Sequence, residues 1–167
     1  GLEIIETSPA EHDKQNAKTL SFVHFIGRSL LASGIGHQDI YTPGYLDLLS
    51  ILPHTTNDNW QLFFDMNNYN PYSAPLRENF RDAGLELEEK IIRAQEKDEL
   101  EIEREIIDLL DSRILKLLKK RFESVEKVSE YKKKNEMKTV NREREAKILE
   151  DKKKRFDLSD EFIEEFY

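Results

Sequence analysis

Several charged residues in the second half of the chain have types and spacings that suit the binding of a small anion. Arg121 and Lys132 are eleven residues apart, which on an α-helix amounts to about 20° of net rotation and roughly 16 Å along the axis. The two side chains therefore share one face of the helix and can converge on one small ligand. Arginine binds a carboxylate through two parallel hydrogen bonds, whereas lysine supplies a compact positive charge.

Three other charged residues extend this set. Arg104 precedes Arg121 by 17 residues, or roughly 26 Å, on a different flank, so it reaches the same ligand only from a second copy of the chain. Arg144 and Glu145 lie in the first turn of an expected helix. The negative charge of Glu145 suits the positive end of the helix dipole, and exposed backbone N–H groups beside Arg144 would favour binding of an anion. The alternative is that the runs at 119–121 and 132–134 are solvated charges with Glu partners, which is the commoner outcome for such runs.

The composition excludes several classes of function. A net charge of −8 argues against a general nucleic-acid binder, because neutralising phosphates needs a basic surface. The absence of cysteine excludes disulfides, thiolate chemistry and cysteine-based zinc sites. The most apolar stretch, residues 20–35, is interrupted by His24 and Arg28 and is too short to span a bilayer. No signal peptide is visible, so we expect a soluble cytoplasmic protein.

The chain divides into two parts of different composition. All five prolines and all six glycines lie at or before Gly84, and the 83 residues that follow contain neither. We place a domain boundary near residues 93–98, which gives domains at 1–95 and 96–167. Both read as helical, so the expected fold class is all-α.

The first part predicts short helices joined by turns. Ser8 precedes Pro9 and stands three residues before Glu11, a capping box at the start of a helix that continues to Gly34. Gly34 and Gly36 form a lone G-x-G with no preceding strand, so they are no dinucleotide fingerprint. Further helices are expected at about 45–52, 59–67 and from about 76. Residues 2–5 resemble a strand without a partner, which suggests that the chain was cut from something larger.

The second part predicts one helix of about nine turns, followed by two shorter ones. Its apolar positions at helical spacing are Ile102, Ile106, Leu109, Leu110, Leu117, Leu118, Val125 and Val128. Such a stripe needs partner helices or a second copy of itself. We expect a turn at 135–139, Asn141 as the cap of the second helix, and Ser159 as the cap of the third. Leu158 is placed to contact Ile163 across that cap.

An ordered set of positions in this part points to a known family. The set comprises Ile102, Arg104, Ile106, Ile107, Leu109, Leu110, Asp111, Ile114, Leu115, Leu117, Leu118, Arg121, Val125, Val128, Lys132, Arg144 and Glu145. Together, from about residue 100 to residue 167, these positions resemble the all-helical chorismate mutase family. The resemblance implies a three-helix domain with one long helix in an intertwined homodimer, and conversion of chorismate to prephenate without any metal or cofactor.

The same resemblance implies a role for each site residue. Arg121, together with Arg104 of the partner subunit, would clamp carboxylates, and Lys132 would meet the ether oxygen and a carboxylate. Glu145 would accept the ring hydroxyl with Arg144 beside it, while Arg142 and Glu143 would be solvated. Asn141 stands where the family often has Asp, which would weaken a hydroxyl contact. A Ser and a Gln or Glu that the family places on the third helix would lie beyond residue 167.

The first part resembles the helical C-terminal domain of prephenate dehydrogenases. The resemblance rests on residues 8–13, Ala17, His24-Phe25 and 41–45, and extends to about residue 92. In that family this domain dimerises and lines the prephenate pocket, while the nucleotide fold and the catalytic histidine lie upstream. His12 and His24 read as helix-packing or capping residues, with a pocket role as the alternative. His54 stands at the position that best matches a prephenate-binding Arg of bacterial relatives, and because the residue differs, the resemblance implies no role for His54.

A dehydrogenase tail followed by a mutase resembles archaeal multifunctional enzymes of tyrosine and phenylalanine biosynthesis. The full-length protein would then use NAD or NADP for its dehydrogenase step, and the mutase product would be the dehydrogenase substrate. The alternative, from another class, is a non-catalytic helical dimerisation scaffold in which the long helix only pairs. Both hypotheses predict helices and a dimer, so loss of ultraviolet absorbance from added chorismate is the observation that separates them.

Overall fold

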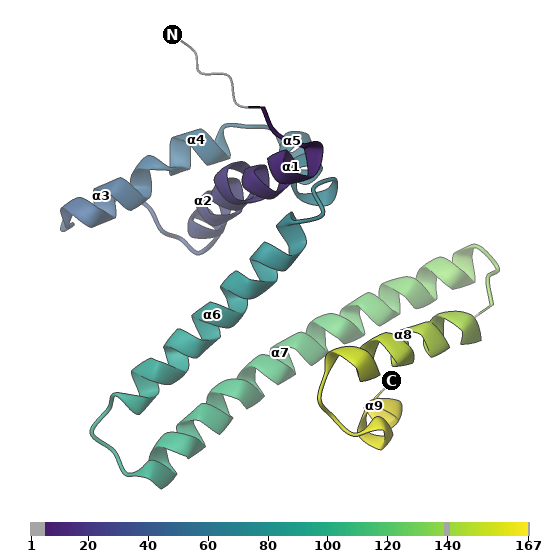
Figure 1. Ribbon diagram of the computed structural model, residues 1–167. Helices are drawn as coiled ribbons and strands as arrows, with labels where there is room; N and C mark the ends of the chain where they lie inside the picture. The colour runs from purple at the N-terminus through teal and green to yellow at the C-terminus, as the bar shows by residue number, and fades with distance from the viewer. Residues whose placement is uncertain (1–5, 139–140, 167) are drawn as a thin grey trace. The chain divides into compact units, whose positions relative to one another are not determined.

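The computed structural model describes residues 6–138 and 141–166, and the regular structure in these ranges is helical throughout (Figure 1). The prediction of an all-α fold is therefore confirmed for the described residues. The strand expected at residues 2–5 lies outside them. The chain separates into two compact units, Gly1–Lys97 and Asp98–Tyr167.

The first unit begins with a helical run whose two ends follow from the sequence. Its helices are α1 (Pro9–Asn16), the π-helix η1 (Ala17–Ser21), α2 (Phe22–Ala32), α3 (Pro43–Ser50), α4 (Leu52–Thr56), α5 (Trp60–Asn68) and α6 (Ser73–Arg93). The Ser8 hydroxyl accepts the Glu11 N–H at 3.2 Å, as the capping pattern predicts. Gly34 has φ +79°, and beyond it the Ile35 N–H donates to the Leu30 carbonyl at 3.0 Å. This glycine-terminated Schellman turn ends α2, as predicted.

The π-helix η1 interrupts the run that the sequence predicts as one regular α-helix, so that prediction is wrong in this segment. The segment packs against α5 and α6, and its buried Ser21 hydroxyl donates to the Met66 carbonyl at 2.9 Å. The Ser73 hydroxyl donates to the same carbonyl at 3.3 Å. Asn70 Nδ2 donates to the Asp13 carbonyl at 2.7 Å. Contacts with α5 and with the connection between α5 and α6 thus fix both sides of the wider turn, and hydrophobic periodicity alone carries no signal for it.

Two small residues let α2 and α4 approach closely. Gly27 and Thr55 are both buried, and a Cβ placed on Gly27 would lie 1.9 Å from the Thr55 hydroxyl oxygen. That hydroxyl donates to the Ile51 carbonyl of its own helical turn at 2.8 Å. The sequence predicts one helix at about 45–52, whereas the structure has α3 and α4 in succession, with Pro53 in the first turn of α4.

A polar and aromatic cluster surrounds the only buried histidine among the described residues. His24 is 7 % exposed, and its Nδ1 lies 3.5 Å from Asp58 Oδ2. Arg28 Nη2 donates to the Asp58 carbonyl at 2.6 Å, and its guanidinium carbon lies 4.2 Å from the centre of the Trp60 ring. His24 therefore takes part in helix packing. His12 is exposed, and its Nε2 lies 3.0 Å from Asn16 Nδ2.

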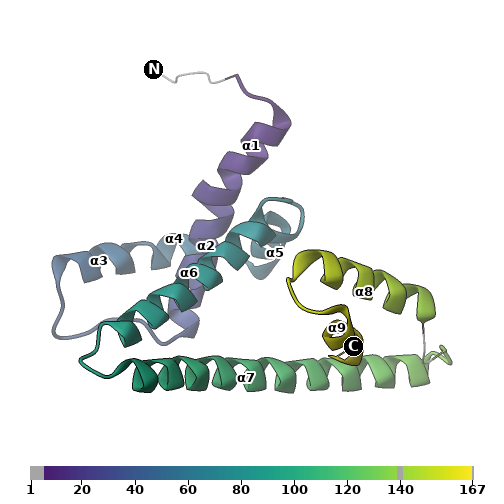
Figure 2. The ribbon, with the colours of Figure 1, turned by 60° about the horizontal axis from the view of Figure 1, so that its bottom comes forward.

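The second unit is built on one long helix, which Figure 2 shows along its length. Its helices are α7 (Glu99–Lys134), α8 (Arg142–Arg155) and α9 (Asp160–Phe166). Asp98 caps α7 by accepting the Glu101 N–H at 2.9 Å. At the other end Glu136 has φ 52°, and the Met137 N–H donates to the Lys132 carbonyl at 2.9 Å. The 36 residues of α7 bear out the single long helix that the apolar spacing predicts.

Much of the apolar stripe of α7 is uncovered. Leu117, Val125 and Val128 are each more than half exposed, whereas Ile106 is only 5 % exposed. In the same unit α8 and α9 pack on each other, and Ile163 of α9 is 4 % exposed. A long apolar face of α7 is therefore open to solvent.

Candidate active site

The long helix α7 carries three of the predicted site residues. Arg121 and Lys132 are half-buried, whereas Arg104 is exposed. All three belong to one unbroken helix, so the rotation and rise expected from their spacing apply directly. Arg121 and Lys132 share a face, and Arg104 lies about 26 Å from Arg121 along the axis.

Asn141 caps α8 and thereby fixes its first turn. Its side-chain oxygen accepts the Arg144 N–H at 3.0 Å, and its carbonyl accepts the Glu145 N–H at 3.0 Å. The predicted cap is confirmed. These two N–H groups are consequently satisfied within the turn and do not bind an anion. Once its oxygen caps the helix, the Asn141 side chain still offers a ligand the two Nδ2–H donors and the second lone pair of that oxygen.

Lys132 and Asn141 line one pocket at the turn between α7 and α8. It has a volume of about 420 Å³, and Met137, Lys138, Arg142 and Glu143 complete its lining. Three of its six lining residues are cationic, so the pocket favours an anion by simple Coulomb attraction. Arg142 and Glu143, which the sequence predicts as solvated, are exposed but border this pocket.

Arg144 lines a different pocket. That pocket, of about 300 Å³, is formed along α8 by Arg144, Lys147, Ile148, Asp151 and Lys152. Arg104, Arg121 and Glu145 line neither pocket. One copy of the chain thus places Lys132 beside Asn141 but does not gather all six predicted residues around one cavity.

Arg121 instead meets an aromatic side chain from α9. Its guanidinium carbon lies 5.6 Å from the centre of the Phe166 ring. Phe166 is not among the site residues predicted from the sequence. The available signal was the apolar face of α9, because Phe162, Ile163 and Phe166 recur at helical spacing.

Lys153 is a second residue of this region that is not among those predicted from the sequence. From α8 its Nζ lies 2.6 Å from Glu164 Oε1 and 3.2 Å from Asp160 Oδ2, both on α9. These contacts raise the pKa of Lys153 above its ordinary value, the hydrogen bond with Glu164 most of all and the one with Asp160 next. Lys153 therefore joins α9 to α8 by two charged contacts.

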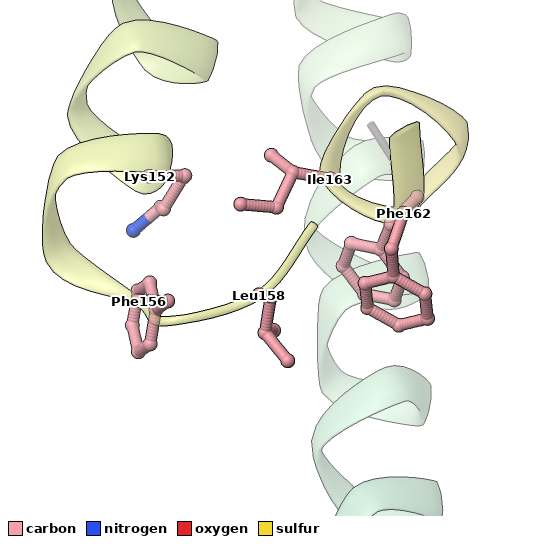
Figure 3. A pocket seen from close by; sticks show the side chains of 6 residues that line it. Lys152, Phe156, Leu158, Phe162 and Ile163 are labelled. Atoms are coloured by element: carbon pink, nitrogen blue, oxygen red, sulfur yellow. The ribbon is translucent and has the colours of Figure 1, made fainter. Parts of the chain in front are cut away.

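An apolar pocket of about 260 Å³ lies beside this joint. Figure 3 shows Lys152 of α8 and Phe156 directly after it, with Leu158 from the segment that leads into α9 and Phe162 and Ile163 from α9 itself. Phe166 completes the lining. Leu158 and Ile163, predicted to contact each other across the cap, border the same pocket, and the Ser159 hydroxyl accepts the Phe162 N–H at 3.2 Å.

Comparison with protein families agrees with this division of the chain. Residues 103–167 match the family described as chorismate mutase type II. Residues 29–103 match the family described as TYRAAT1-like, C-terminal domain. The chain joins a TYRAAT1-like C-terminal domain to a chorismate mutase type II domain. Both resemblances inferred from the sequence are confirmed, and the second unit is called the mutase domain from here on.

Two curated relatives from Arabidopsis thaliana match part of the chain. Arogenate dehydrogenase 2, chloroplastic, is 34% identical over 71 residues, which are 42% of this chain and 20% of the relative. Arogenate dehydrogenase 1, chloroplastic, is 32% identical over 83 residues, which are 50% of this chain and 13% of the relative. The chain therefore spans a fifth or less of these relatives. Among the described residues, no helix combines the length and the apolar character needed to cross a bilayer.

The residues described here do not fit a nicotinamide cofactor. Dinucleotide sites of dehydrogenases use a glycine-rich turn that follows a strand and begins a helix. Gly34, in the one G-x-G of the chain, instead ends α2 at a positive φ, and no strand precedes it within residues 6–33. No hydride-transfer step is therefore assigned to these residues.

Proposed function

We propose that the mutase domain converts chorismate to prephenate. The family match over residues 103–167 carries this proposal. It is supported by the placement of Arg121 and Lys132, both half-buried, on the same long helix. The reaction is a concerted Claisen rearrangement, in which one C–O bond breaks as one C–C bond forms within the same molecule. Such a step needs no nucleophile or general base, so a site made of cations and hydrogen-bonding groups is sufficient.

The proposed roles follow from the charge of the substrate. Arg121 binds a carboxylate of chorismate through its planar fork of donors. Lys132 donates to the ether oxygen, on which negative charge grows as the C–O bond breaks, and this contact strengthens in the transition state. Glu145 accepts the ring hydroxyl, and Arg144 adds positive charge beside it. Holding the substrate in its compact conformer lowers the entropic part of the barrier.

Asn141 has a restricted place in this scheme. Its side-chain oxygen already accepts the Arg144 N–H, so we propose that it meets the substrate mainly through Nδ2, as a donor. An aspartate at this position would present an acceptor to the ring hydroxyl instead. The proposed hydroxyl contact therefore depends mainly on Glu145.

We further propose that the mutase domain works as an intertwined homodimer. Leu117, Val125 and Val128 are more than half exposed along α7, and a second copy is the simplest cover for such a stripe. Within one chain, Arg104 is too far from Arg121 to share a site with it. Pairing of two long helices would instead bring Arg104 of the partner subunit to the site that contains Arg121. Light scattering that finds a folded monomer would contradict the dimer.

The activity is tested directly by the loss of ultraviolet absorbance when the purified protein is added to chorismate. We expect Arg121→Ala and Lys132→Ala each to lower kcat/KM by about 10²- to 10³-fold, the usual cost of removing one charge-stabilising donor. Lys133→Ala is the matched control, because Lys133 is an exposed neighbour in the same last turn of α7. A protein that leaves the absorbance of chorismate unchanged would instead favour the dimerisation scaffold.

The origin of Arg104 is tested by mixing two inactive variants. Arg104→Ala and Arg121→Ala each damage both sites of a homodimer, but a mixed dimer has one site with both substitutions and one with neither. Random re-pairing makes half of the dimers mixed, so about a quarter of the wild-type activity should return. If the chains verifiably exchange and no activity returns, Arg104 does not act across the interface.

For the full-length protein we propose a multifunctional enzyme in which a dehydrogenase for prephenate or a closely related substrate precedes the mutase domain. The support is the match of residues 29–103 to the TYRAAT1-like C-terminal domain and the partial matches to the two arogenate dehydrogenases. The nicotinamide cofactor, NAD or NADP, would bind a part that these residues do not supply. Prephenate-dependent reduction of NAD or NADP by this chain alone would contradict that division of labour.

A further inference from the structure

One aromatic contact in the mutase domain connects α9 to a proposed substrate-binding residue. Arg121 of α7 and Phe166 of α9 are 45 positions apart in the sequence, and the guanidinium carbon lies 5.6 Å from the ring centre. That distance is within the range in which a cation is attracted to the face of a ring. We propose that Phe166 is a positioning residue that fixes the guanidinium of Arg121 for the substrate carboxylate, an inference that rests on the proposed function.

Contacts of other α9 side chains hold the helix itself in place. Phe162 and Phe166 lie one turn apart, with ring centres 6.4 Å apart and planes at 17°. Ile163 is 4 % exposed between them on the buried side of the helix. Lys153 of α8 contacts Glu164 and Asp160. Burial of Ile163 and the two contacts of Lys153 thus hold α9 without using the Phe166 ring.

The contact suits a residue that must still bind an anion. Attraction to a ring face uses none of the N–H donors of the guanidinium, so this contact does not compete with a carboxylate for them. A long arginine side chain loses rotamer freedom when it binds a ligand, and a side chain that is already held loses less. Phe166 therefore improves substrate binding by ordering Arg121 in advance.

The critical variant is Phe166→Leu, which keeps apolar bulk on α9 but removes the ring. Because the Lys153 contacts and buried Ile163 remain, we expect α9 to stay docked, with an unchanged far-ultraviolet circular dichroism spectrum. We expect KM for chorismate to rise about two- to fivefold with little change in kcat, the scale of an exposed cation–π contact. Phe166→Tyr keeps a ring face and should restore the wild-type KM.

Phe162→Leu is the matched control, because it makes the same substitution one turn earlier on the same helix and in the same pocket. We expect its KM to stay close to the wild-type value. An equal rise of KM in Phe162→Leu and Phe166→Leu would show that the effect comes from packing of α9, and would overturn the proposal. A Phe166→Leu variant with wild-type KM would overturn it as well.

A second measurement does not depend on activity. The Nε–H proton of Arg121, observed by NMR in the folded protein without ligand, should be shifted upfield by the ring current of Phe166 and should lose that shift in Phe166→Leu. An identical Arg121 resonance in the two proteins would refute the contact. If the wild-type protein leaves chorismate unchanged, the proposed function fails, while the NMR result still decides whether Phe166 holds Arg121.

Discussion

Substitution of Gly27 by alanine tests the close approach of α2 and α4. The new Cβ would lie 1.9 Å from Thr55 Oγ1 and 2.7 Å from Thr55 Cβ. Rotating the Thr55 side chain moves the hydroxyl away but breaks its 2.8 Å hydrogen bond to the Ile51 carbonyl. The Cβ contact stays in every rotamer, because Cβ is fixed to the backbone. The two helices must therefore separate.

The magnitude follows from three opposing contributions. Alanine in place of glycine inside a helix stabilises by about 1 kcal/mol. Overpacking of a buried contact costs about 1 to 3 kcal/mol, and the displaced hydroxyl of Thr55, which is 1 % exposed, costs about 1 kcal/mol more. We expect Gly27→Ala to lower the free energy of unfolding of the first unit by about 1 to 3 kcal/mol.

Fluorescence during urea unfolding is the suitable assay, because the chain has a single tryptophan, Trp60 on α5 of the first unit. Gly84→Ala is the matched control: Gly84 lies within α6, and an added Cβ has no other atom within 4 Å. We expect this control to stabilise the unit by up to about 1 kcal/mol. If Gly27→Ala stabilises to the same degree, α2 and α4 do not meet at Gly27 and Thr55, and the reasoning is wrong.

Three further predictions concern the mutase domain. Glu136 has φ 52°, so Glu136→Gly should raise the free energy of unfolding by about 1 kcal/mol, and an unchanged thermal midpoint would contradict this. Arg144→Ala should lower kcat/KM at least about tenfold, and more than Arg142→Ala does, although Arg142 rather than Arg144 borders the pocket of Lys132; equal losses would refute the distinction between the two arginines. The pKa of Lys153 is raised in the folded protein. Its contacts therefore stabilise the fold fully at pH values below the ordinary lysine pKa, and this stabilisation is lost as the pH rises through the folded-state pKa. Unfolding measured from about pH 9 to about pH 12 should therefore show an alkaline loss of stability that is smaller in Lys153→Met.

The helix ends were the part of the fold most readily predicted from sequence. Ser8, Asn141 and Ser159 each accept an N–H three residues ahead, and Gly34 takes the positive φ that ends α2. These features are local, because a cap depends on the cap residue and the first turn alone. The π-helix η1 and the succession of α3 and α4 depend on what packs against them, and hydrophobic periodicity carries no signal for such contacts.

For the candidate site, the sequence predicted residue types and their order along α7 and α8 but not their surroundings. Spacing places Arg121 and Lys132 on one face, since both belong to one helix. It gives no indication that Asn141 uses its oxygen for the cap of α8, or that Phe166 lies against Arg121. The second contact joins residues far apart in the sequence, and no local pattern specifies it.

The π-helix η1 also determines which length changes the first unit can tolerate. Its wider turn holds one residue more than an α-helical turn, so deleting any single residue there would restore regular α-helix and rotate α1 by about 100° relative to α2. Ser21 could then keep its bond to the Met66 carbonyl, but the Asp13 carbonyl would turn away from Asn70 Nδ2. Related chains that lack one residue in this segment must have lost one of these bonds or shortened the connection between α5 and α6 to match. In sequence alignments, a gap within η1 should therefore be accompanied by a second gap in the connection between α5 and α6.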